Sequence, residues 1–251
     1  MRPQIQWSGT GQPVLLFPGW NTQAGSVYSW LPASFRENHR CGILEWPGLG
    51  KAEDELLPED LDSFLDNLVE ALPLNPIPIV GFCMGGIAAW AFAQRHPRLV
   101  SALFLVETPL SFPAILGPLL APGLGGVVLG LAKDTTWGRF LVRRAILQAT
   151  IRYSESFLQE LFDFKRKAAL HYLRLFYAYN KALGHNKQTR PATCPCWQLV
   201  GQNPIRALAP YWGPRQQVES TVLTLDGAGH FPAVETPAVF FEHLERLLAG
   251  L

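Results

Sequence analysis

Residues 79–86 read Ile79-Val80-Gly81-Phe82-Cys83-Met84-Gly85-Gly86, a short apolar run that passes through small residues into the helix-like stretch Ile87–Arg95. The pattern G-x-C-x-G-G between a strand and a helix is typical of a nucleophile elbow, with cysteine in place of the usual serine. Glycines on both sides let the strained backbone turn without a clash. The N-terminus of the following helix favours negative charge on the sulfur. We therefore predict that Cys83 is a nucleophile and that the backbone N–H of Met84 donates to an oxyanion.

A histidine follows the last apolar run of the chain. The sequence Gly227-Ala228-Gly229-His230 lies between that run and a terminal amphipathic stretch, Val239–Leu248. A loop after the final strand can carry its side chain over the carboxyl edge of a sheet, and in enzymes with a nucleophile elbow the base comes last in the chain. We predict that His230 is the general base for Cys83.

The loop after the first long apolar run supplies the third motif, Leu16-Phe17-Pro18-Gly19-Trp20. In enzymes with an elbow, the corresponding loop contributes a second backbone N–H to the oxyanion hole. Gly19 allows a close approach of the backbone. The backbone N–H of Trp20 is the predicted donor, although an ordinary turn with a packed tryptophan would also fit the pattern.

Short apolar runs bounded by turn residues recur along the chain, and helix-like stretches separate several of them. Continuous Val/Ile/Leu-rich runs are typical of parallel strands covered on both faces. One of the helix-like stretches is Leu61–Leu72, for which Asp60 is a suitable N-cap. The alternation predicts an α/β fold with a doubly wound, mostly parallel sheet. The predicted strands are Val14–Phe17, Gly42–Glu45, Ile77–Gly81, Ala102–Val106, Trp197–Val200 and Thr221–Leu225.

The alternation stops between Leu110 and Arg190, where two helical stretches follow one another, Thr136–Tyr153 and Ser154–Leu183. An insertion of helices into an α/β chain predicts a cap over the carboxyl edge of the sheet, where open sheets bind ligands. We therefore predict a core formed by residues 1–109 and 191–251 and a helical cap or lid formed by residues 110–190.

These motifs, together with Trp46-Pro47-Gly48-Leu49-Gly50, resemble the α/β-hydrolase superfamily from end to end. Within it the chain is most similar to the pimeloyl-[acyl-carrier-protein] methyl ester esterases of biotin synthesis. Those enzymes share an H-G-W oxyanion turn, an L-P-G-x-G loop and a four-helix cap. This chain departs from them with Pro18 in place of histidine and Cys83 in place of serine. Cysteine elbows also occur in dienelactone hydrolases and polyhydroxyalkanoate synthases, so Cys83 alone does not choose the substrate.

The resemblance implies a cofactor-free carboxylesterase acting on an ester linked to acyl carrier protein. Two alternatives remain open at this stage. One is a thioesterase or a small-ester or lactone hydrolase that needs no carrier. The other belongs to a different class: a degenerate scaffold that binds an acyl ligand without turnover.

No acidic residue occupies the position at which the family usually has the third member of the catalytic triad. The family places an acid in G-x-x-D after the strand before the last, and this chain has Gly201-Gln202-Asn203-Pro204 there. Asn203 could orient the imidazole in a Cys-His-Asn arrangement, because a cysteine–histidine ion pair depends less on a charged third member. Glu107, directly after the predicted strand Ala102–Val106, is the acid that we favour. The remaining alternative is that Cys83 and His230 act as a pair, with no third member.

Basic residues are concentrated in the predicted cap. Beside an apolar channel they suit an acyl chain carried on an acidic protein or on phosphopantetheine, and the resemblance implies docking of acyl carrier protein. A solvated helix face would explain them equally well. The predicted substrate- or carrier-binding residues are Arg143, Arg144, Arg152, Lys165, Arg166 and Lys167.

Composition excludes several other classes. The formal net charge of +1 argues against nucleic-acid binding. The four cysteines show neither a disulfide framework nor paired zinc ligands, so no metal is expected, and Cys194 and Cys196 are predicted to enter a buried strand. Residues Thr108–Ala132 lack charge, but their prolines and glycines argue against stable membrane insertion. We expect this segment to line the mouth of a pocket, with interfacial lipid contact left open. No signal peptide is recognisable, and we expect a cytoplasmic protein.

Overall fold

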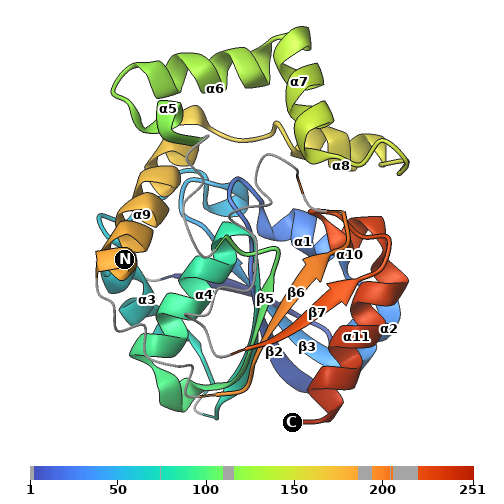
Figure 1. Ribbon diagram of the computed structural model, residues 1–251. Helices are drawn as coiled ribbons and strands as arrows, with labels where there is room; N and C mark the ends of the chain where they lie inside the picture. Colours follow the sequence, from blue (N-terminus) through green and yellow to red (C-terminus); the bar gives the residue numbers. More distant parts are fainter. Residues whose placement is uncertain (1–2, 74, 110–115, 186–193, 204, 206–219) are drawn as a thin grey trace.

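The computed structural model describes residues 3–73, 75–109, 116–185, 194–203, 205 and 220–251. A seven-stranded sheet with the order β1-β3-β2-β4-β5-β6-β7 forms its centre (Figure 1). The edge strand β1 is antiparallel to β3, and every other pairing is parallel. The strands are β1 (Gln4–Ser8), β2 (Gln12–Phe17), β3 (His39–Glu45), β4 (Ile77–Phe82), β5 (Val100–Val106), β6 (Cys196–Gly201) and β7 (Thr221–Leu225).

The six strands predicted from the apolar runs are all present, and the predicted doubly wound α/β fold is confirmed. Strand β1 was not predicted. Its sequence, Gln-Ile-Gln-Trp-Ser, is half polar, and most of its residues are only partly buried. An edge strand has a solvated face and therefore lacks the continuous apolar run that marks the interior strands.

Helices cover both faces of the sheet because alternate residues of each strand point to opposite sides. Leu15 and Phe17 of β2 pack in one apolar cluster with α3 (Leu61–Leu68) and α4 (Met84–Arg95). Val14 and Leu16 pack in the other cluster with the opposite set of helices. That set comprises α1 (Ala24–Trp30), α2 (Ala33–Asn38) and α11 (Pro237–Ala249). The predicted cap of α3 is confirmed, since the Asp60 side chain accepts a hydrogen bond from the Ser63 N–H at 2.7 Å.

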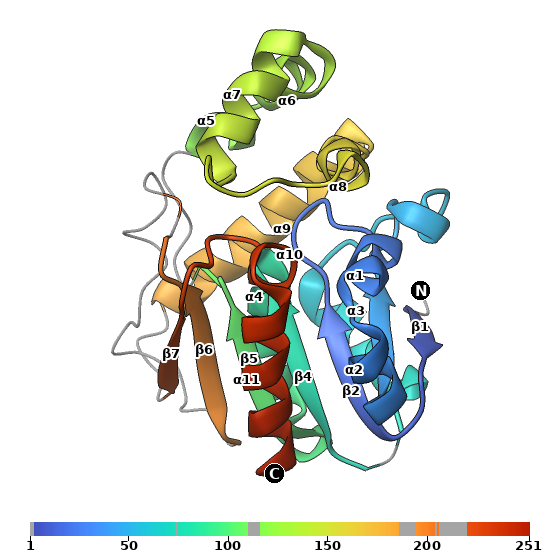
Figure 2. The same ribbon diagram turned by 90° about the vertical axis from the view of Figure 1, so that its right-hand side faces the viewer.

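Between β5 and β6 the described residues form five helices, and most of them stand beyond the ends at which the parallel strands finish (Figures 1 and 2). The two predicted helical stretches were too long: α7 ends at Ile146, and the second stretch divides at a turn after Glu160. Residues 110–115 and 186–190 of the predicted cap lie outside the described residues. The helices are α5 (Gly117–Leu120), α6 (Leu124–Asp134), α7 (Thr136–Ile146), α8 (Glu155–Glu160) and α9 (Arg166–His185).

Helix α6 lies outside the two helical stretches predicted for the cap, in the part of the chain rich in glycine and proline. One of its glycines is needed for packing, because a Cβ atom on Gly125 would overlap the Leu119 carbonyl oxygen. Tertiary contact therefore offsets the cost of glycine within a helix, which is about 1 kcal/mol per residue.

Cys41, Cys83, Cys194 and Cys196 are all free, and Cys196 begins the buried strand β6, as predicted. Among the described residues, no helix is long and apolar enough to cross a membrane.

Candidate active site

Cys83 occupies a strained turn between β4 and α4. Its φ of 49° and ψ of −125° lie in a region that non-glycine residues rarely adopt. The backbone N–H of Cys83 donates to the Val106 carbonyl oxygen at 2.8 Å, which fixes the turn to the neighbouring strand. A side chain on Gly85 would overlap the Pro18 carbonyl oxygen, and one on Gly86 would overlap Thr108. The glycines after Cys83 therefore allow the turn to pack against both adjoining loops.

His230 and Glu107 meet beside this turn. The Nδ1 atom of His230 lies 3.4 Å from Oε2 of Glu107, and the Cys83 side chain hydrogen-bonds to the same imidazole ring. The other Glu107 oxygen accepts the Gly201 N–H at 2.5 Å. The exposed fraction is 9% for the His230 side chain and 2% for that of Glu107. Thiol, imidazole and carboxylate thus form one chain of contacts.

Backbone strain gathers at the same edge of the sheet. Among the described residues that are not glycine, three have positive φ: Asn21 at 59°, Cys83 at 49° and Glu107 at 47°. Each lies in the loop after a parallel strand, namely β2, β4 or β5. Strain of this kind persists only where surrounding contacts enforce it, and it is often concentrated in active sites.

The charges around His230 determine its protonation. Burial of the ring by itself lowers the pKa of His230, but the negative charges of Cys83 and Glu107 more than offset it and raise the pKa above 6.5. The imidazole is therefore held as an imidazolium over a wider pH range than a free histidine. Such a ring can donate a proton to a leaving group.

Removing either negative neighbour should lower the pKa of His230. We expect the pKa in Cys83→Ala and in Glu107→Gln to lie below the wild-type value, because desolvation remains while one attraction is lost. The charge on the His230 ring stabilises the folded protein fully below the unfolded pKa of about 6.5, and this stabilisation is lost as pH rises through the folded pKa. Because the folded pKa should be lower in both variants, the loss should begin at lower pH in them than in wild type. NMR titration of the His230 ring measures the shift. An unchanged pKa in both variants would show that the charges do not act on the ring.

The loop after β2 brings a second backbone segment to Cys83. A Cβ atom built on Gly19 would lie 3.2 Å from the Cβ of Cys83, so this loop passes directly beside the elbow. Trp20 follows Gly19, and its indole N–H donates to the Ala169 carbonyl oxygen of α9 at 2.8 Å. Met84 is the first residue of α4. The two residues predicted to form the oxyanion hole thus lie on adjacent segments that border the thiol.

Asn203, the alternative third member, lies in a different environment. Its side chain is exposed, and its backbone N–H donates to the Ala228 carbonyl oxygen at 2.9 Å. Asp226 on the same edge is also exposed. The structure brings Glu107, rather than either of these residues, into contact with His230.

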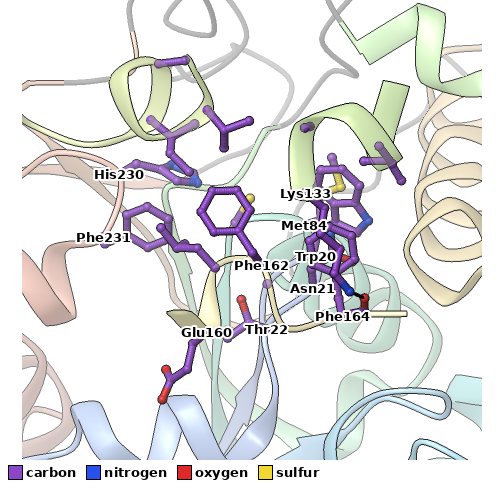
Figure 3. A pocket seen from close by; sticks show the side chains of 18 of the residues that line it. Trp20, Asn21, Thr22, Met84, Lys133, Glu160, Phe162, Phe164, His230 and Phe231 are labelled. Atoms are coloured by element: carbon purple, nitrogen blue, oxygen red, sulfur yellow. Dashed lines mark hydrogen bonds between the residues drawn. The ribbon is translucent and has the colours of Figure 1, made fainter. Parts of the chain in front are cut away.

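A cavity of about 440 Å³ opens over the thiol. Cys83, Met84, Trp20 and His230 lie on its wall, together with apolar side chains of the helices between β5 and β6 (Figure 3). The expectation that the uncharged segment lines a pocket is confirmed for its described residues. Those on the wall are Leu116, Pro118, Leu119, Val128, Leu129 and Ala132.

The predicted carrier-binding residues have different surroundings. Lys165 pairs with Glu53 at 3.3 Å and with Asp54, and Arg166 lies 4.0 Å from Asp134. The Arg143 guanidinium lies 5.7 Å from the Phe162 ring. Arg144, Arg152 and Lys167 of this set are exposed.

The sequence analysis missed a buried carboxylate that supports the histidine loop. Glu235 of α10 (Pro232–Glu235) is 9% exposed and accepts hydrogen bonds from the Gly229 N–H, the Gln148 amide at 3.1 Å and the Tyr153 hydroxyl at 2.5 Å. Burial and the neighbouring carboxylate raise the pKa of Tyr153. Because Gln148 and Tyr153 lie in the segment after α7, Glu235 joins the helical insertion to the loop that carries His230. The sequence offered one indication of this role, which is that Glu235 follows His230 by only five residues.

Replacing Glu235 by glutamine should destabilise the protein. The amide presents a donor where three donors converge, and a buried donor left without an acceptor costs roughly 1–3 kcal/mol. Urea unfolding of Glu235→Gln should show this loss. The matched variant Glu242→Gln, which breaks an exposed pair with Arg246 in α11, should stay within about 0.5 kcal/mol of wild type. Equal stabilities of the two variants would contradict a supporting role for Glu235.

Comparison with known proteins agrees with this architecture. The chain is 27% identical over 259 residues to the pimeloyl-[acyl-carrier protein] methyl ester esterase of Shewanella woodyi, covering 98% of this chain and 95% of the relative. It is 28% identical over 170 residues to the esterase of the same name from Shewanella sp. (strain MR-7), covering 64% of this chain and 62% of the relative. The crystal structure of Cfl2 from Burkholderia cenocepacia superposes with a TM-score of 0.79 at 17% identity, covering 98% of this chain and 92% of that one.

A family description agrees with the sheet and the elbow as well. The family described as having the alpha/beta hydrolase fold matches residues 12–195, which include the elbow, the loop after β2 and the helical insertion. On this match, the chain belongs to the α/β hydrolase fold family.

Proposed function

We propose that the chain hydrolyses carboxylic esters, with Cys83 as nucleophile, His230 as proton carrier and Glu107 as the third member of the triad. The observation that carries the proposal is the continuous contact of thiol, imidazole and buried carboxylate at the floor of an apolar cavity. The named activity of the relatives from Shewanella supports ester hydrolysis. Residues 110–190 act in this proposal as a cap over a core formed by residues 1–109 and 191–251.

Acylation is the first half of the reaction. His230 takes the thiol proton of Cys83, and the sulfur attacks the ester carbonyl carbon. The negative charge that develops on the carbonyl oxygen is held by the backbone N–H groups of Trp20 and Met84. His230 then gives its proton to the alkoxide, and the alcohol leaves while a thioester forms on Cys83. Glu107 keeps the ring oriented and stabilises its positive charge throughout.

Deacylation regenerates the enzyme. His230 takes a proton from a water molecule and the hydroxide attacks the thioester carbonyl. The sulfur then leaves, and His230 returns the proton to it. One ester and one water therefore yield one carboxylic acid and one alcohol. The raised pKa of His230 favours transfer of the thiol proton to the ring at the start of the first half-reaction.

A methyl ester on an acyl chain carried by acyl carrier protein is the substrate that we favour. The cavity wall is mostly apolar and suits a long acyl chain, and the relatives act on pimeloyl-[acyl-carrier protein] methyl ester. Exposed Arg144, Arg152 and Lys167 would receive the acidic carrier. A thioesterase or small-ester hydrolase without a carrier is the second candidate, motivated by the ion pairs that already occupy Lys165 and Arg166.

Two substrates separate these candidates. Purified protein would be given pimeloyl methyl ester on acyl carrier protein and, in parallel, the p-nitrophenyl ester of a short acid. In the double variant Arg144→Glu/Arg152→Glu, kcat/KM on the carrier-linked ester should fall roughly tenfold or more while the small ester is unaffected, because only the larger substrate carries the acidic partner. Equal rates of the variant and wild type on both substrates would favour the carrier-free candidate.

A further inference from the structure

Large apolar side chains are concentrated on the outer surface of α6 and α7. Of the ten exposed large apolar residues in the described part of the chain, six belong to these two consecutive helices. Trp137 is 74% exposed and stacks edge-on against Phe140, whose ring centroid lies 5.9 Å away. We call this set the outer apolar face: Leu124, Val127, Leu131, Trp137, Phe140 and Leu141.

Helical periodicity explains how this face arises. In α6 the exposed apolar residues are three and four positions apart, at Leu124, Val127 and Leu131. In α7, Phe140 and Leu141 follow Trp137 by three and four positions. Each set therefore lies on one side of its helix. The other sides of the same helices line the cavity above Cys83, through residues such as Val128 and Val142. The pair of helices is thus apolar on two sides and stands away from the sheet (Figure 2).

Exposed basic side chains accompany the face. Arg139 and Arg144 of α7 are exposed, as is the one acid of the two helices, Asp134. Half-buried Lys133 lines the cavity instead, and the half-buried Arg143 guanidinium lies 5.7 Å from the ring of Phe162, another residue of the cavity wall. Arg144 is exposed and follows Phe140 and Leu141 by one helical turn. Apolar and aromatic side chains flanked by arginine are the combination with which a helix lies in the headgroup region of an anionic membrane.

We infer that the outer apolar face docks on the surface of a bilayer that contains anionic lipid, with α6 and α7 lying in the headgroup region and spanning nothing. A second copy of the chain is disfavoured because a two-fold contact through this face would bring the same arginines together. An acidic protein is disfavoured as the occupant of the face itself, because the six side chains that define the face are apolar. The carrier proposed above would contact Arg144 at the edge of the face. The cavity opens between these helices and the elbow. Docking would therefore place it next to the bilayer, in which apolar esters dissolve.

Vesicle co-sedimentation of the full-length Cys83→Ala variant tests the inference without any reliance on the proposed activity. Vesicles of phosphatidylcholine alone would be compared with vesicles containing phosphatidylglycerol. The protein should bind the anionic vesicles, and the triple variant Trp137→Ser/Phe140→Ser/Leu141→Ser should bind them roughly tenfold or more weakly. Leu56→Ser, which removes a side chain that is 81% exposed elsewhere, is the matched control and should bind as the parent does.

Other outcomes would overturn the inference. Absence of binding to both kinds of vesicle would do so, as would binding that the triple variant leaves unchanged. A dimer in sedimentation velocity that the triple substitution dissociates, without vesicle binding, would assign the face to a second copy. Circular dichroism of the triple variant checks its fold; because all three side chains are exposed, the spectrum should match that of the parent.

Discussion

Replacing Cys83 by alanine is expected to lower kcat/KM on a carboxylic ester by about 10³-fold or more, since only the binding site and the oxyanion donors would remain. The thiol lies at the strained turn and contacts the His230 ring, so the substitution removes the only atom placed to form the acyl intermediate in the proposed reaction. Initial rates on a p-nitrophenyl ester measure the effect. Turnover that survives unchanged in Cys83→Ala would refute covalent catalysis by this residue.

Cys194→Ala is the matched control for Cys83→Ala. Cys194 is a free, half-buried thiol, and burial raises its pKa. Burial also raises the pKa of Cys41 to about 11 and that of Cys196 to about 12. Because the thiolate is the reactive form, these three thiols should react slowly with iodoacetamide at neutral pH. The control variant should therefore keep wild-type activity and wild-type labelling of Cys83.

Replacing Glu107 by glutamine is expected to lower kcat by roughly 10- to 100-fold, less than the loss of a triad acid beside serine, because a cysteine–histidine ion pair keeps part of its reactivity. KM should change little, since the buried carboxylate contacts His230 and the Gly201 N–H. Asn203→Ala, one residue before the position that the G-x-x-D pattern gives to the acid, should leave both constants near wild type because its side chain is exposed. Steady-state kinetics of the two variants on one ester decide the point. A large loss in Asn203→Ala with an active Glu107→Gln would reverse the assignment.

Local signals in the sequence were enough to predict the elbow and the histidine loop. The turn at Cys83 depends on glycines that are its immediate neighbours, and His230 lies in a short loop between a strand and a helix. The interior strands were predictable for a similar reason, because burial on both faces leaves a continuous apolar run. The edge strand β1 lacks that run and was missed.

The features that could not be predicted from the sequence depend on contacts between segments that are far apart in the chain. Glu107 and Asn203 were both plausible partners for His230 until the pairing of β5 with β6 placed Glu107 against Gly201. Glu235 takes its partners from positions 82 and 87 residues away, which no local pattern reveals. The same holds for α6, which was not predicted and in which Gly125 packs closely against the Leu119 carbonyl oxygen.

Detection of the acyl-enzyme tests the central claim most directly. Wild-type protein mixed with a p-nitrophenyl ester would be quenched in acid within the first turnover, digested and examined by mass spectrometry. We expect the acyl group on the peptide that contains Cys83, and no such adduct in Cys83→Ala. An acyl group found on another residue, or steady hydrolysis with no adduct on Cys83 at any quench time, would contradict it.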